Sequence, residues 1–135
     1  MTLKPHSIHG PSHWQRVEEH GQIIAEHSQA DALIVTLFAM LHDCQRLSDG
    51  RDPDHGPRAA ILIRANTLEF SFLSEMQLAA LTHACEHHTH EIHHPDITIG
   101  ACYDADRLDL PRVGIRVDPR FLNTDVARTL AQSRM

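Results

Sequence analysis

A histidine and an aspartate stand side by side at the end of the most apolar segment of this chain. Residues 32–41 read Ala-Leu-Ile-Val-Thr-Leu-Phe-Ala-Met-Leu, and His42 and Asp43 follow directly. A carboxylate beside a buried apolar face needs a partner, because an unpaired buried carboxylate is costly. A cation would satisfy the imidazole and the carboxylate together. The pair therefore suggests metal chemistry, against the simpler alternative of a helix end whose polar side chains bond to a neighbouring loop.

Other histidines and aspartates extend this pair into a longer pattern. The chain holds 13 histidines, a number that suggests metal or proton chemistry, or a solvated His-rich surface. The order His…His-Asp…Asp on successive helices resembles the HD-domain superfamily of metal-dependent phosphohydrolases, and in particular a compact bacterial subfamily of it. The resemblance covers about His9 to Arg128. The pieces that carry it are HGPSHWQRV, LHDCQR, DPDHG, ACEHHT and DADRLDLPRVG.

The resemblance implies one divalent metal ion held by four side chains: His13, His42, Asp43 and Asp106. His9 remains an alternative to His13, and Asp104 remains an alternative to Asp106. Two imidazoles and two carboxylates suit Mn, Fe, Co, Ni or Mg better than a structural zinc site with thiolates, although Zn stays among the candidates. Four protein ligands leave two positions of an octahedral ion for water and a phosphate oxygen.

The function that the resemblance implies is hydrolysis of a phosphoester by metal-activated water, with Asp43 in the catalytic centre. The substrate would be a small phosphorylated metabolite or a nucleotide. The alternative is a degenerate HD module that binds metal or nucleotide in a regulatory role without turnover. Some HD nucleotidases carry a glutamate three residues after the His-Asp pair, and this chain has Arg46 there. That departure favours the module or a slow enzyme.

Substrate charge and proton transfer require further groups. Arg46 lies one helical turn after the histidine of the pair and is expected to face a substrate phosphate. Arg58 is a second substrate-binding candidate, with a solvated surface position as an equal alternative. The general acid or base is expected among His55, His88 and Asp104. His55 and His88 would also serve a second ion, but a single ion is the expectation.

The string His90-Glu91-Ile92-His93-His94 matches the metallopeptidase motif HExxH. That motif requires a continuous helix with both histidines on one face. Pro95 follows at once, and a helix rarely runs up to a proline. We therefore expect this segment to belong to a solvated histidine patch that binds Ni or Zn adventitiously.

The fold that must position these residues is predicted to be all-α, a compact single-domain HD-type bundle of five to six helices. Helix starts are indicated by Ser12 with Gln15, by Asp31, and by Ser74 with Gln77. The expected helices cover about residues 11–28, 31–42, 97–108 and 124–131, with two others beginning near 57 and 74. No segment alternates convincingly between apolar and polar residues, so no strand is predicted.

Two helical faces are expected to be buried. In the first helix Trp14, Val17, Gly21 and Ile24 recur at helical spacing. In the helix that begins near residue 74, the expected buried residues are Met76, Leu78, Leu81 and Cys85.

Composition limits the remaining choices. The chain of 135 residues is expected to be one HD domain over 1–135, with its core at about 9–128. A net charge of −6 argues against duplex nucleic acid as a partner. The longest apolar-rich run, residues 32–41, is too short to span a membrane. Three scattered cysteines and an N-terminus without an apolar stretch favour a cytoplasmic protein. A homo-oligomer, in which a second subunit completes the pocket, is consistent with the short chain.

Overall fold

The computed structural model describes residues 10–46 and 52–133, and over these ranges the chain is all-helical, without a strand. Six α-helices are present there: α1 (Pro11–Glu26), α2 (Ala32–Leu41), α3 (His55–Ala65), α4 (Glu75–His87), α5 (Ile97–Arg107) and α6 (Asp125–Ser133). Two short 3-10 helices, η1 (Leu110–Val113) and η2 (Pro119–Phe121), connect α5 to α6. The predicted all-α class is therefore confirmed.

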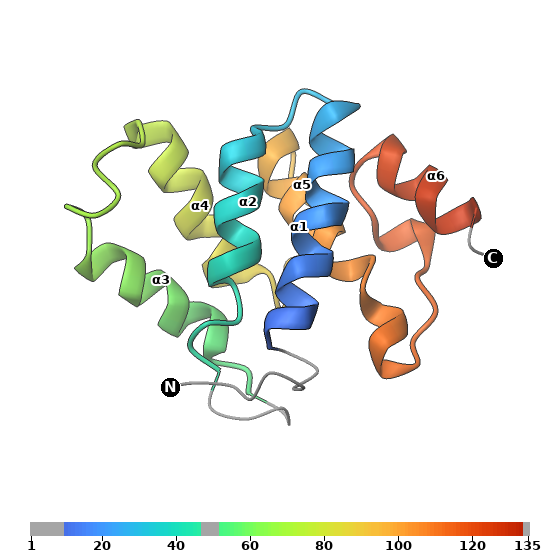
Figure 1. The fold of residues 1–135 in the computed structure, drawn as a ribbon, viewed down its shortest axis with the longest axis horizontal. Coiled ribbons are helices and arrows are strands. Elements are labelled where there is room, and N and C mark those ends of the chain that lie inside the picture. Colours follow the sequence, from blue (N-terminus) through green and yellow to red (C-terminus); the bar gives the residue numbers. More distant parts are fainter. Residues whose placement is uncertain (1–9, 47–51, 134–135) are drawn as a thin grey trace.

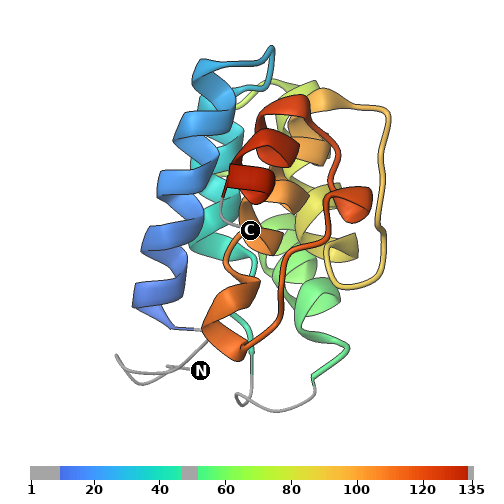
Figure 2. The ribbon, with the colours of Figure 1, turned by 90° about the vertical axis from the view of Figure 1, so that its right-hand side faces the viewer.

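The helices form a bundle around α2. Helix α1 packs beside α2 and against α5, whereas α3 and α4 form a second pair on the other side of α2 (Figure 1). Helix α6 contacts α5 and η2 and covers the side of the bundle away from α3 (Figure 2). The N-terminal ends of α1 and α3 and the C-terminal ends of α2, α4 and α5 come together in the lower half of Figure 1. Residues at five helix ends can therefore share one site.

Local signals set several of these ends. The Asp31 side chain accepts hydrogen bonds from the backbone N–H groups of Leu33 and Ile34, and thereby caps α2. Ser74 and Gln77 form the predicted reciprocal capping box at α4. The cap predicted at Ser12 is wrong, because Gly10 occupies the N-cap position and Ser12 lies within the first turn, after Pro11.

Burial follows the predicted faces, although Trp14 and Leu78 are only half-buried and one predicted core residue is exposed. Val17, Gly21 and Ile24 of α1 are buried, as is Leu81 of α4. Met76 was expected in the core but is 84% exposed. It lies five residues before Leu81, which places it about 140° around the helix from that buried side chain.

A glycine allows α3 to approach α4 at the end where the site lies. A Cβ atom on Gly56 would lie 2.7 Å from the carbonyl oxygen of Cys85 and 2.8 Å from that of Glu86. Any side chain at this position would push α3 away from the end of α4. Within the described ranges, no helix combines the length and the hydropathy that a membrane crossing requires.

Candidate metal centre

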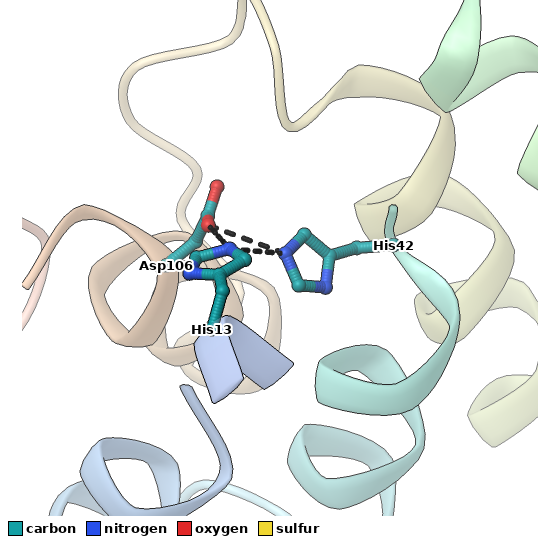
Figure 3. A group of neighbouring side chains, drawn as sticks. All are labelled: His13, His42 and Asp106. Carbon is teal, nitrogen blue, oxygen red and sulfur yellow. Dashed lines mark hydrogen bonds and ion pairs between the residues drawn. The ribbon is translucent and has the colours of Figure 1, made fainter. Parts of the chain in front are cut away.

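Four side chains that the resemblance selects converge on one point. His13 lies in the first turn of α1, His42 and Asp43 follow α2, and Asp106 lies in the last turn of α5. Nε2 of His13 lies 3.1 Å from Nε2 of His42 and 3.3 Å from Oδ2 of Asp43. Oδ1 of Asp106 lies 3.1 Å and 3.2 Å from the same two nitrogens. Figure 3 shows His13, His42 and Asp106 pointing toward one another. We call these four side chains the first ligand group.

The other carboxylate oxygen of Asp43 belongs to a second set of ligand atoms. Oδ1 of Asp43 lies 3.0 Å from Nε2 of His55, the first residue of α3, and 3.7 Å from Nε2 of His88, which follows α4. The two imidazole nitrogens are 3.0 Å apart. We call Asp43, His55 and His88 the second ligand group. Asp43 is therefore shared, with one oxygen facing each group.

Each of the four imidazoles is oriented by a hydrogen bond from its other nitrogen. Nδ1 of His13 lies 2.7 Å from Oδ2 of Asp109. The remaining three Nδ1 atoms lie within 3.1 Å of backbone carbonyl oxygens: His42 at Phe38 and Ala39, His55 at Asp52, and His88 at Cys85. A proton held on Nδ1 by such an acceptor leaves the Nε2 lone pair free to bind a metal ion. All four Nε2 atoms point into the two ligand groups.

Asp109 also belongs to the candidate site, although it was not among the site residues expected from the sequence. Besides the bond with His13, its carboxylate accepts a hydrogen bond from Nε of Arg16 at 2.6 Å. The signal that could have found it is its spacing, because residues three apart on a helix share a face. Asp109 follows Asp106 by three residues, and the two carboxylates reach the same imidazole.

In the first ligand group, the carboxylates favour the protonated, positively charged form of the imidazoles. Burial opposes a charge on His13, but hydrogen bonds with Asp106, Asp109 and Asp43 outweigh it and raise the pKa of His13 to about 9. Burial likewise opposes charge on Asp43, yet the imidazolium of His42 and hydrogen bonds from the histidines hold its pKa well below the usual range. The buried carboxylates therefore keep a positive charge between them.

The donor set fits a pair of divalent ions. All the ligand atoms are imidazole nitrogens and carboxylate oxygens, and no thiolate belongs to either group. Such a mixed set accepts Mn, Fe, Co, Ni or Zn in four- to six-coordinate geometry. The shared carboxylate of Asp43 is the arrangement expected where one residue bridges two ions.

A pocket of about 460 Å³ opens onto both groups. Arg46 lines it, as predicted for a substrate-facing residue, and its Nε lies 3.5 Å from Oδ1 of Asp43. Arg112 also lines the pocket and was not identified from the sequence. The other lining side chains come from both ligand groups and from the pocket rim: Asp43, Asp52, Pro53, His55, His88, Thr89, His90 and Asp106.

Two residues that were expected in the site, Asp104 and Arg58, do not line the pocket. Asp104 is fully buried, and its carboxylate accepts hydrogen bonds from the backbone and side chains of Asn123 and Thr124. It therefore holds the start of α6 and does not face the pocket.

Arg58 binds the carbonyl oxygen of Gln45 and the carboxylate of Asp52, so it fixes the chain around the pocket rather than lining it. Of the two ligand alternatives, the structure brings Asp106 and not Asp104 to the site, whereas His9 lies outside the described residues.

The HExxH segment is not helical, as its proline indicated. Helix α4 ends at His87, and residues 91–94 have no regular structure. His83, Glu91 and His94 still form a third group of potential ligands. Here, however, Nδ1 of His94 accepts a hydrogen bond from the backbone N–H of Asp96, so the neutral ring carries its proton on Nε2. This group therefore lacks the orientation that all four buried imidazoles share.

Proton competition predicts the pH dependence of metal binding. A proton on His13 must leave before an ion binds, and its raised pKa of about 9 means that this competition continues up to that pH. The pKa of His42 is also raised well above its usual value, so the proton on His42 competes with the ion as well. Apparent affinity should therefore rise by at least about tenfold per pH unit between 7 and 8. On the ordinary pKa of histidine, about 6.5, the fall would come only between pH 6 and 5. Chelator competition at pH 6, 7 and 8 measures how the apparent metal affinity changes with pH. An affinity that stays constant over this range would show that no histidine proton has to leave before the ion binds.

Comparison of this chain with protein-family models, curated proteins and solved structures finds no match.

Proposed function

We propose that this chain is an HD-type metal-dependent phosphohydrolase whose centre holds two divalent ions. The observation that carries the proposal is Asp43, whose two oxygens face two separate pairs of imidazole nitrogens at 3.0–3.7 Å. Two ions replace the single ion expected from the sequence. On this proposal His55 and His88 are ligands, because their Nε2 atoms point at the shared carboxylate, and they do not act as the general acid or base.

Divalent ions at this centre would lower the pKa of a water nucleophile and polarise the phosphoryl oxygen. Other side chains at the pocket would bind the substrate and orient the ligands. Arg46 lies beside the shared carboxylate and donates to a phosphoryl oxygen, where a charge-assisted hydrogen bond compensates the negative charge. Asp109 holds the ring of His13 in the ligating tautomer.

A proton for the leaving oxygen must come from a side chain that is not a ligand. Among the titratable residues that line the pocket, Asp52 pairs with Arg58, and the remaining carboxylates and buried histidines point into the ligand groups. His90 is the lining residue left for this task. Its Nε2 lies 3.1 Å from Nδ1 of His87, which is close enough to replace the proton after transfer.

The test is turnover of p-nitrophenyl phosphate by metal-stripped protein reloaded separately with Mn, Fe, Co, Ni, Mg or Zn. We expect metal-dependent hydrolysis that Arg46→Ala lowers by about tenfold to two-hundredfold in kcat/KM while metal content stays unchanged. Arg46→Lys should recover part of this loss, because a point charge replaces a two-pronged donor.

Arg64→Ala is the matched control, since Arg64 pairs with Glu86 on the surface away from the pocket. It should behave as wild type. Metal binding without turnover for any ion would favour the second candidate of the sequence analysis, a binding module. Equal activity of Arg46→Ala and Arg64→Ala would remove Arg46 from the substrate site.

A further inference from the structure

Two histidines outside the pocket share one face of α4. His83 and His87 are four residues apart on this helix, and their ring centroids are 4.5 Å apart. The paired rings within the two buried ligand groups are no closer, at 5.2 and 4.8 Å. Two histidines at this helical spacing are placed to hold one metal ion between them. Neither side chain lines the pocket of the candidate metal centre.

The helix distinguishes this pair from the HExxH motif that follows it. His90 and His94 have the same spacing in sequence, but both lie beyond the end of α4, and residues 91–94 have no regular structure. Nδ1 of His94 accepts a hydrogen bond from the backbone N–H of Asp96, which keeps the proton of the neutral ring on Nε2. The spacing that binds a metal ion is therefore realised in α4 and not in the motif.

Glu91 brings a carboxylate to the same surface. Its Oε1 lies 2.9 Å from Nε2 of His83 and accepts a hydrogen bond from the buried hydroxyl of Tyr103 at 2.7 Å. Nη2 of Arg107 donates to the backbone carbonyl oxygen of Glu91 at 2.5 Å. These bonds hold the carboxylate against α4. The side chains of His83, His87 and Glu91 are 29–34% exposed, so an ion can reach a group that is already fixed in place.

The donor set determines the kind of ion. Imidazole binds Cu, Ni and Zn well, whereas Mg and Mn prefer sites made of oxygen atoms. The contacts that such an ion would replace are surface contacts: His83 with Glu91, and His87 with Glu86 and His90 at 3.1 Å each. Exposed pairs of this kind contribute little to stability, so their loss costs the ion little.

The geometry points to a peripheral site in which His83, His87 and Glu91 bind one Cu²⁺, Ni²⁺ or Zn²⁺ ion. The sequence predicted only adventitious binding by a histidine patch, whereas this site is confined to three side chains. The ion would join α4 to the segment that follows it, three residues after the buried ligand His88. Because the site is open to solvent, gel filtration should remove its ion, and the metal content of the buried centre is then counted separately.

Titration of the Asp43→Ala protein with Ni²⁺ tests this site while the buried centre is empty. Calorimetry should give one ion per chain, and His83→Ala and His87→Ala should each raise the dissociation constant by at least about tenfold. Glu91→Gln should raise it by about threefold to tenfold, because the amide keeps an oxygen ligand but loses the charge. Wild-type protein should take up the same ion in addition to those of the buried centre. Mn²⁺ should bind the site at least about a hundredfold more weakly than Ni²⁺.

His93→Ala is the matched control, because His93 is an exposed histidine of the same segment whose Nε2 bonds to the carbonyl oxygen of Arg120. It should keep the parent dissociation constant, and circular dichroism should show every variant folded. Equal losses for His87→Ala and His93→Ala, or several weakly bound ions per chain, would mean an adventitious ion only and would overturn the proposal. Failure of the proposed function is seen separately, as p-nitrophenyl phosphate that stays intact with every metal.

Discussion

Asp43→Ala should empty both ion positions at once, lowering the metal content from about two ions per chain to none. The carboxylate supplies one ligand atom to each group and lies nine-tenths or more buried among imidazoles, so no neighbouring side chain can replace it. Helix α2 should remain folded, because it is held by the buried side chains of Ile34, Val35 and Phe38. Elemental analysis by mass spectrometry gives the stoichiometry, and circular dichroism gives the helical content.

Two further variants sharpen this result. His88→Ala removes a ligand of the second group alone and should leave about one ion per chain. Asp125→Ala removes a carboxylate that is 97% exposed and should leave the metal content unchanged. An Asp43→Ala protein that keeps a full ion would show that this carboxylate does not serve both groups.

Asp104→Ala should cost stability and spare metal binding. The carboxylate accepts hydrogen bonds from two backbone N–H groups, one amide and one hydroxyl, at 2.7–3.1 Å. Alanine leaves these donors without their acceptor in a buried place, which we expect to cost about 3 kcal/mol. For a chain of this size that loss corresponds to a fall in Tm of about 10 °C.

Asp96→Ala is the reference variant against which the loss of stability in Asp104→Ala is compared. Asp96 also accepts two backbone hydrogen bonds, but as an exposed cap of α5, and its loss should cost about 1 kcal/mol. Thermal unfolding of metal-free protein compares the two variants directly. A normal Tm for Asp104→Ala, together with lost turnover, would return Asp104 to the candidates for the general acid or base.

The aspartates of the segment DADRLDL show how far the sequence alone could lead. The resemblance pointed to Asp106, and the structure places it with His13 and His42. Successive helical residues turn by about 100°, so Asp104 lies about 200° from Asp106 and Asp109 only about 60° from it. That geometry was available from the sequence and would have separated the three roles. The helix expected over residues 97–108 already ran almost to Asp109, so the sequence allowed this separation.

The second ligand group was harder to foresee because its members are brought together by packing. His55 and His88 are 33 residues apart and meet only because Gly56 lets α3 approach the end of α4. Helix boundaries, in contrast, depend on local chemistry, and the caps at Asp31 and Ser74 were predictable. Arg112 carries no local signal of its role, since its place in the pocket depends on the turn that follows α5.

Anomalous diffraction from crystals soaked in Mn²⁺ tests the two-ion centre most directly. We predict two peaks about 3.5–4 Å apart, the usual spacing of paired catalytic ions, with one oxygen of Asp43 facing each peak. His13, His42 and Asp106 should surround the first peak, and His55 and His88 should flank the second. A single peak at the first ligand group, or a strongest peak at His83 and Glu91, would contradict the two-ion centre.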